Sequence, residues 1–272
     1  MAYELKEEDI ARYYKDGYIV FRRIIPASLV RDLRVEADKG TILARNKRGP
    51  QTQRLQPVQA YAGELNMKPF QDYKELPDLN DAIHKLLTPN HYHGVADVLG
   101  ILIEPANVAW CTSWHRDITL KTSRLSESEF YDLLLDWNSM NQINAPLYDD
   151  NCTWFVPGTH VRMKDLPSEH AAAVRDMELG VGWPNVAVEA ENPVQREYNC
   201  FAYCQGMPGA VQLQLQAGDF ALYRPAGLHL GCYLPYQRRA TLHDILFTPQ
   251  LETWWRAWAK GESPRWTRSI TV

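Results

Sequence analysis

The sequence has no long apolar run, no excess of one charge and no even set of cysteines. None of its 272 residues belongs to a stretch near the roughly 18 consecutive apolar residues that a membrane-spanning helix needs. The N-terminus is charged and lacks an apolar core, so we expect no secretory signal and a cytoplasmic location. A net charge of -4 argues against nucleic-acid binding, because phosphate binding requires a basic surface.

The cysteines do not form a disulfide pattern. Cys111, Cys152, Cys200, Cys204 and Cys232 are odd in number and irregularly spaced. We interpret them as buried or free thiols in a reducing cytoplasm. Cys200 and Cys204 could form half of a zinc site, but no second pair of cysteines or histidines follows at a matching spacing.

Aromatic residues are abundant, with nine Trp, fourteen Tyr and seven Phe. All-β folds and enzyme pockets share this bias. With 45% apolar residues, a chain of this length can bury roughly three quarters of its unfolded surface in one core. No linker or repeat interrupts the sequence, so we expect a single domain over residues 1–272.

The N-terminal residues 1–98 have mostly helical patterns. Periodicity predicts helices over 4–16, 29–45 and 80–98, a strand over 18–25 and a loop or lid over 46–75. Gly17 is expected to end the first helix, and Ser28 to cap the second. This part of the chain therefore predicts an N-terminal helical layer.

Residues 99–250 have a different sequence pattern, in which short apolar runs alternate with turn signals. Many short strands of this kind predict a sandwich or barrel. Helical patterns interrupt it at 126–140 and 167–177, and 185–198 is expected to be an insertion loop. The Trp-rich segment 254–258 indicates a helix that packs on the β-fold. The predicted class is mostly β with helices (α+β).

A His-x-Asp motif, His115-Arg116-Asp117, lies in the β-rich half. Residues i and i+2 of a strand face the same side, so His115 and Asp117 can present an imidazole and a carboxylate to one metal ion. The motif alone is weak, because a chain with eight histidines often contains it by chance.

A second histidine follows two turn signals in the segment 218–231, which runs from Gly218-Asp219 to His229-Leu230-Gly231. Two histidines and one carboxylate form the facial arrangement that suits non-haem Fe(II) and leaves positions open for O2 and a co-substrate. Only a closed β-fold could bring His229 to Asp117, which is distant in the sequence.

Two arginines, Arg238 and Arg239, come shortly after His229. A guanidinium inside a β-fold is costly unless it meets a carboxylate. The distal carboxylate of a dicarboxylic keto acid would satisfy it. Strand alternation indicates that one arginine faces inward and the other outward, without deciding which.

Together these segments resemble the phytanoyl-CoA dioxygenase-like family of Fe(II)/2-oxoglutarate oxygenases. The family's motifs are His-x-Asp, Pro-Gly-(Ser/Thr)-His, Gly-Asp with a later His-x-Gly, and Arg. This chain matches them in order with His115-Arg116-Asp117, Pro157-Gly158-Thr159-His160, Gly218-Asp219 with His229-Leu230-Gly231, and Arg238. The start, Asp16-Gly17-Tyr18, is also similar to the family's, and the resemblance spans most of the chain.

The resemblance implies a double-stranded β-helix, a jelly-roll or cupin-like core, over residues 99–250. The helical layer 1–98 would precede it, and a C-terminal helix would lie within 251–272. His160 is expected to be structural and to lie near the metal but outside its coordination shell.

The resemblance also implies the cofactor site. His115, Asp117 and His229 would hold Fe(II), and Arg238 would bind the distal carboxylate of 2-oxoglutarate, with Arg239 as the alternative. The implied reaction is hydroxylation of a small-molecule metabolite, with O2 consumed and succinate and CO2 released. Related halogenases replace the carboxylate ligand with a small residue, so Asp117 disfavours halogenation.

Two other readings stay open beside the oxygenase. One is a cupin-like protein that binds a metal without turnover, and the other is an inactive fold that serves as an interaction module. The intact ligand set disfavours the inactive module, and an internal arginine disfavours the pure metal binder. We expect a small-molecule substrate and neither a nucleic-acid nor a membrane partner; the oligomeric state is left open.

The expected pocket includes further residues. Gln142 and Asn144 share one face of a strand, which either lines the pocket or is an exposed polar face. The segments 46–75, 118–140 and 183–205 are the expected walls. On these segments Arg54, Tyr61, Lys121 and Arg196 could meet an anionic substrate, but the favoured interpretation is that they are solvated surface residues. We expect His91 and His93 on the surface, and His243 in packing or on the surface.

Overall fold

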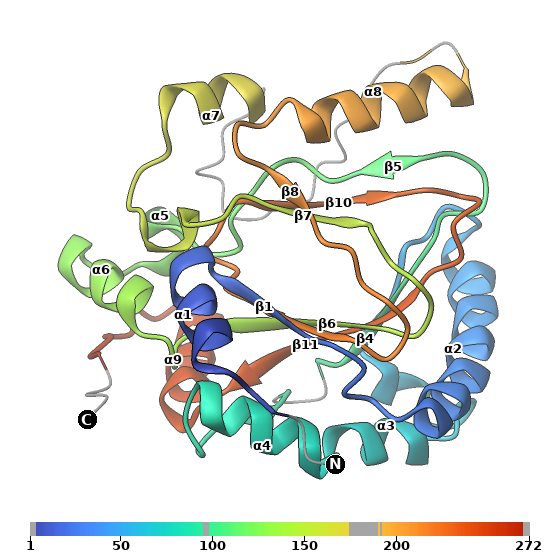
Figure 1. The fold of residues 1–272 in the computed structure, drawn as a ribbon, viewed down its shortest axis with the longest axis horizontal. Coiled ribbons are helices and arrows are strands. Elements are labelled where there is room, and N and C mark those ends of the chain that lie inside the picture. Colours follow the sequence, from blue (N-terminus) through green and yellow to red (C-terminus); the bar gives the residue numbers. More distant parts are fainter. Residues whose placement is uncertain (1–3, 95–97, 174–189, 191, 269–272) are drawn as a thin grey trace.

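Two antiparallel sheets face each other in the computed structural model, with helices on their outer sides (Figure 1). The structure describes residues 4–94, 98–173, 190 and 192–268. Within these residues the large sheet has the strands β1 (Tyr18–Phe21), β2 (Arg54–Leu55), β3 (Tyr92–His93), β4 (Gly100–Ile103), β6 (Asn141–Pro146), β9 (Phe220–Tyr223) and β11 (Ala240–Phe247). The small sheet has β5 (Trp110–Cys111), β7 (Thr153–Phe155), β8 (Val211–Gln212) and β10 (His229–Tyr233).

Strands distant in the sequence are neighbours in both sheets. The large sheet has the order β1-β9-β6-β11-β4-β2, and β3 pairs with β11 beside this path. The small sheet has the order β5-β10-β7-β8. The long strand β11 pairs with both β6 and β4, so it forms the centre of the large sheet.

The described helices cover the outer faces of the sheets (Figure 1). They are α1 (Glu7–Asp16), α2 (Ala27–Arg48), α3 (Lys68–Lys74), α4 (Pro77–Leu86), α5 (Leu120–Ser123), α6 (Glu127–Leu135), α7 (Pro167–Ala173), α8 (Pro193–Gln205) and α9 (Pro249–Ala259), with short 3-10 turns η1 (Val58–Tyr61) and η3 (Thr159–Val161). α8 lies over the small sheet, and α1 to α4 lie around the large one. None of the described helices combines the length and apolar character that crossing a bilayer demands.

The first helix follows the sequence pattern closely. Its first turn carries three acidic residues, which the positive end of the helix dipole stabilises, and Tyr13 is its buried residue. Gly17 ends the helix in the left-handed conformation, with φ +85°, and its N–H donates to the carbonyl of Tyr13. Only glycine adopts this conformation without strain.

Several elements differ from the sequence expectation. Residues 1–98 are not purely a helical layer, because β1, β2 and β3 belong to the large sheet. The segment 46–75, expected as a loop or lid, contains β2, η1 and α3. Ser28 is not the N-cap of α2. The helix begins at Ala27, directly after Pro26, so Ser28 already lies in its first turn.

The expected insertion loop over 185–198 is wrong where the chain is described. Residues 185–189 and 191 lie outside the described residues, but α8 begins at Pro193. Asn192 caps it by accepting from the backbone N–H of Gln195, and Pro193 occupies the first helical turn, where its missing N–H costs nothing. An Asn-Pro pair therefore starts a helix here and does not mark a loop.

Two apolar cores hold the sheets to their helices. The larger packs the outer face of the large sheet, including Ile101 and Leu222, against residues of α1 to α4 such as Leu33 and Leu79. The smaller lies between the small sheet and α8, and includes four of the five cysteines. Two further clusters pack α5, α6 and α9 beside the sheets and join β8 to β1 and β9.

We predict that Gly17→Ala lowers the free energy of unfolding more than Gly49→Ala or Gly63→Ala does. A Cβ at Gly17 would lie 2.3 Å from Nδ1 of the buried His160, in addition to the strained φ. Gly49 has φ +87° and ψ 169° but open space around it, so Gly49→Ala should cost only the backbone strain, about 1–3 kcal/mol. Gly63 has neither constraint, so Gly63→Ala should change stability by about 1 kcal/mol or less.

Chemical denaturation of the three variants measures this order. Equal losses for Gly17→Ala and Gly49→Ala would show that the contact with His160 does not matter.

Candidate active site

The three predicted metal ligands converge where β10 begins. His115 and His229 form an isolated antiparallel bridge: the N–H of His115 donates to the carbonyl of His229 over 3.1 Å, and the reverse bond is 3.0 Å. Asp117 is held by its own N–H, which donates to the carbonyl of Pro225 over 3.0 Å. One ligand atom from each of these side chains lies within 4.8 Å of the others.

Backbone carbonyls fix the orientation of both imidazole rings. Nδ1 of His115 lies 2.7 Å from the carbonyl of Ser113, and Nδ1 of His229 lies 2.9 Å from that of Gly227. Because a carbonyl only accepts, each Nδ1 carries the proton and each Nε2 presents a lone pair. The two Nε2 atoms lie 3.4 and 3.6 Å from the carboxylate oxygens of Asp117.

The Asp117 carboxylate is ionised. Burial alone would raise its pKa, but His229 and His115 hold the pKa well below its ordinary value. The side-chain amide of Gln142 also donates a hydrogen bond to this carboxylate. Two imidazole nitrogens and one carboxylate, each with its second atom held by a hydrogen bond, fit a divalent metal such as Fe(II).

The triad opens into a cavity of about 490 Å³ between the two sheets. Its polar lining includes the side chains of Gln142, Asn144, Thr112 and Thr153. Asn144 donates to the hydroxyl of Thr153 over 2.9 Å, so one hydrogen bond crosses from the large sheet to the small one. In the structure the side chains of Gln142 and Asn144 line the pocket and do not form an exposed polar face.

The side chains of Arg238 and Arg239 point to opposite sides, as strand alternation requires. Arg238, expected to bind 2-oxoglutarate, lies outside the cavity: its side chain is 59% exposed and pairs with Asp38 over 2.6 Å. The prediction for Arg238 is therefore wrong, because its guanidinium faces water. Arg239, the alternative, lines the cavity and is 5% exposed.

Arg239 retains unused hydrogen-bonding capacity. Its Nε donates to Asp150 over 2.8 Å, and its guanidinium carbon lies 4.5 Å from the ring centre of Tyr233. Among the described residues, Nη1 has no hydrogen-bond partner although it is buried. A buried guanidinium nitrogen without a partner is costly, so an anionic ligand would stabilise it.

Other cavity residues were missed or misplaced by the sequence reasoning. His243 lines the cavity, and burial lowers its pKa to about 3, so the ring is neutral at physiological pH. Counting in steps of two from Arg239 along β11 would have found it, because Arg239, His243 and Ile245 all line the cavity.

The pair His91 and His93, expected on the surface, is buried instead. His91 is 6% exposed, and the side chain of His93 is 5% exposed and lies 3.4 Å from the Asp244 carboxylate. His160 is buried outside the cavity lining, in η3.

The walls of the cavity agree in part with the expected segments. Arg54 lines it from 46–75, and Ile118, Thr122 and Met140 line it from 118–140. No described residue of 183–205 does so. The C-terminal helix was missed as a wall: α9 contributes three tryptophans, Trp254, Trp255 and Trp258.

The family profile of phytanoyl-CoA dioxygenase (PhyH) matches residues 13–231. The chain belongs to this family. It is thereby an enzyme of the Fe/2-oxoglutarate-dependent oxygenase superfamily. A search among curated proteins finds no match.

Solved structures show the same fold at low sequence identity. AviO1 from Streptomyces viridochromogenes Tue57 is similar with a TM-score of 0.56 and 13% identity, over 89% of this chain and 94% of its own. EvdO2 from Micromonospora carbonacea var. aurantiaca gives 0.54 and 14%, over 91% and 93%. The α-ketoglutarate-dependent epimerase SnoN of nogalamycin biosynthesis gives 0.53 and 16%, over 90% and 83%.

We predict that Gln142→Leu weakens metal binding about 10- to 100-fold, because a hydrogen bond to a ligand carboxylate supports affinity on this scale. Titration of the protein with Mn(II), followed by electron paramagnetic resonance, avoids oxidation and measures the affinity. Asn144→Ala is the matched control, since Asn144 lines the same cavity but bonds to Thr153 and not to the triad. Equal affinities of the two variants would contradict the assigned role of Gln142.

Proposed function

We propose that this protein is an Fe(II)- and 2-oxoglutarate-dependent dioxygenase that hydroxylates a small-molecule metabolite. The observation that carries the proposal is one cavity that contains both the His115–Asp117–His229 triad and the buried guanidinium of Arg239. A protein that only stores or binds a metal has no need for the second feature. Two antiparallel sheets around this cavity support a double-stranded β-helix over residues 99–250, completed by strands from 1–98 into a single domain over 1–272.

His115, Asp117 and His229 would hold Fe(II) through their two Nε2 atoms and one carboxylate. When bound, Fe(II) with O2 supplies the oxidising chemistry that converts 2-oxoglutarate into succinate and CO2 and inserts the second oxygen atom into a substrate C–H bond. The carbonyls of Ser113 and Gly227 keep both rings in the tautomer that binds metal. Gln142 holds the carboxylate in its orientation.

Arg239 would bind the distal carboxylate of 2-oxoglutarate. Its Nη1 is buried and without a partner among the described residues, while Nε is already fixed by Asp150. The guanidinium is thereby held in one orientation before the co-substrate arrives, which lowers the entropic cost of binding. Burial from water strengthens the charge-assisted hydrogen bonds that a carboxylate would form with it.

The remaining cavity wall would bind the substrate. Trp254, Trp255 and Trp258 form an apolar, aromatic surface, and Trp258 is fixed by a 2.8 Å bond from its Nε1 to the carbonyl of Thr122. Such a surface orients a substrate that carries an apolar or ring-containing part and keeps water away from the metal. Arg54, on the opposite wall, is the candidate for an anionic group of the substrate.

The solved relatives indicate which other outcomes to expect. SnoN is an epimerase and SnoK of the same nogalamycin pathway is a carbocyclase, so the same fold supports reactions other than hydroxylation. Asp117 is present, which argues against halogenation. Five buried free thiols support a reducing compartment such as the cytoplasm.

We predict that Fe(II) and 2-oxoglutarate, added without O2, give a weak visible charge-transfer band that is absent in Asp117→Ala. Arg239→Lys should raise the 2-oxoglutarate concentration at half-saturation of this band about 10- to 100-fold, because lysine lacks the planar fork that binds a carboxylate. Arg238→Lys, on the exposed neighbour, should leave it unchanged.

The same proteins, exposed to O2, are then assayed for succinate. No band and no succinate from the folded wild-type protein would favour the metal-binding protein or the inactive module. An effect of Arg238→Lys equal to that of Arg239→Lys would contradict the assignment of Arg239.

A further inference from the structure

Four of the five cysteines meet under α8, on the side of the small sheet away from the cavity. Cys111 lies on β5 and Cys232 directly opposite it on β10, so they form a cross-strand pair. Cys200 and Cys204 lie one turn apart on α8 and therefore face the same side of the helix. All four are at most 5% exposed.

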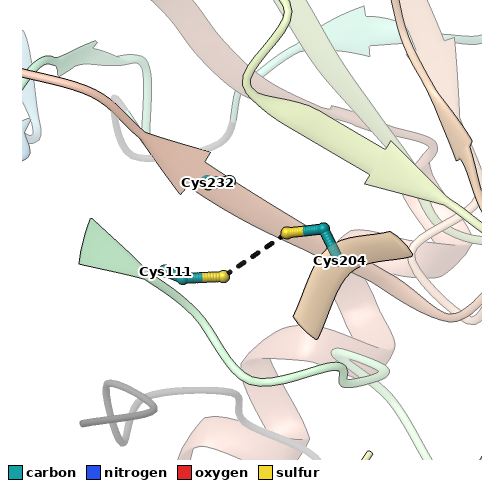
Figure 2. Close-up of side chains that lie close together, drawn as sticks. All are labelled: Cys111, Cys204 and Cys232. Carbon is teal, nitrogen blue, oxygen red and sulfur yellow. Dashed lines mark hydrogen bonds between the residues drawn. The ribbon is translucent and has the colours of Figure 1, made fainter. Parts of the chain in front are cut away.

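The thiols of these residues are in contact. Figure 2 shows the sulfur atoms of Cys111 and Cys204 turned toward each other, 3.7 Å apart, with Cys232 on the adjacent strand. The sulfur atoms of Cys111, Cys204 and Cys232 all lie within 4.8 Å of one another. Cys200 belongs to the same buried cluster, but its sulfur is not within 4.8 Å of all three of the others.

We propose that Cys111, Cys200, Cys204 and Cys232 form a second, structural metal site that binds a zinc ion. A zinc–sulfur distance of about 2.3 Å in a tetrahedron places the ligand sulfurs about 3.8 Å apart. The Cys111–Cys204 distance already has this value, and the sulfur of Cys232 lies within 4.8 Å of both, whereas the sulfur of Cys200 would have to move closer to complete the tetrahedron. Binding converts the thiols into thiolates and releases their protons to solvent.

One cation lies beside the cluster. Arg196 lies one turn before Cys200 on the same side of α8, and its Nε donates to the carbonyl of Ala109 over 2.6 Å. Contact with Cys111 and the charge of Arg196 lower the pKa of the Cys200 thiol, but contact with Cys232 and burial raise it further, to about 11, so the metal ion itself must displace this proton. Contacts with Cys111 and Cys232 lower the pKa of Cys204 to about 6. Soft thiolates in a closed tetrahedral set select zinc over Fe(II).

The cluster is placed to fix the catalytic strands. Residues of opposite parity on β5 and β10 face opposite sides: Trp110, Gly231 and Tyr233 line the cavity, whereas Cys111 and Cys232 face α8. A metal ion here would tie α8 to β5, which ends shortly before His115, and to β10, which begins at His229. Its function would be to hold the spacing of the iron ligands.

The experiment separates this site from the triad by using a His115→Ala/His229→Ala protein, which lacks two triad ligands. The protein is produced in a medium with Co(II) in place of zinc, because a buried site must fill during folding. We expect one cobalt ion per chain, with the strong visible absorption of tetrahedral Co(II) and sulfur-to-cobalt charge transfer in the near ultraviolet. Nitrogen and oxygen ligands at the triad give no sulfur-to-cobalt absorption.

Two cysteine variants in this background locate the site. Cys204→Ser should lose the sulfur-to-cobalt absorption, and Cys152→Ser, which changes the one buried cysteine outside the cluster, should keep it. Folded His115→Ala/His229→Ala protein without this absorption would overturn the proposal. A Cys111–Cys204 disulfide, found by peptide mass analysis of protein made with ample zinc, would also overturn it.

Discussion

The pair of backbone hydrogen bonds between His115 and His229 is the constraint on which the site depends. These residues are far apart in the chain, and each gives its N–H to the carbonyl of the other. The bridge sets the two Cα atoms at the separation of an antiparallel pair, which brings the imidazole rings to 4.3 Å between their centres. Because Nδ1 of each ring is held by a carbonyl two residues earlier, backbone geometry alone aims both Nε2 atoms at one point.

The second constraint is the buried charge of Arg239. Asp150 offsets it, and the same carboxylate accepts from the N–H of Cys152 and the hydroxyl of Thr241. A buried ion pair contributes little net stability compared with apolar packing. Its presence in the same cavity as the His115–Asp117–His229 triad is what the proposed binding of an anionic co-substrate would explain, because an anion would use the hydrogen-bonding capacity that Nη1 retains.

The motifs could be read from the sequence because each depends on local rules. Gly17 ends a helix since it adopts positive φ without strain. The pairing of His115 with Asp117 was expected from the two-residue period of a strand, but in the structure both follow the end of β5 and are held by the bridge to His229 and the bond to Pro225. The choice between Arg238 and Arg239 could not be made this way. Alternation states that the two differ, but the inward one is decided by the register of β11 against β6 and β4, which is a tertiary property.

The segments that sequence reasoning misplaced are those whose burial depends on distant partners. His91 and His93 have a polar pattern, yet β3 pairs with β11 and brings His93 to Asp244 in the interior. The Trp-rich helix α9 was expected to pack on the β-fold, and it does so with Trp254 while also forming a cavity wall. The tryptophans of α9 both pack in the core and line the cavity, because the cavity lies beside the apolar core under this helix.

The strands β5 and β10 connect the two proposed metal sites through the alternation of their side chains. On one face they present Trp110, His229 and Gly231 to the cavity, and on the other they present Cys111 and Cys232 to α8. A strand cannot shift by one residue without exchanging these faces, so anything that fixes the register on the cysteine side also fixes it on the iron side. A structural ion under α8 would thus act on the iron ligands through backbone register, without contact with the cavity.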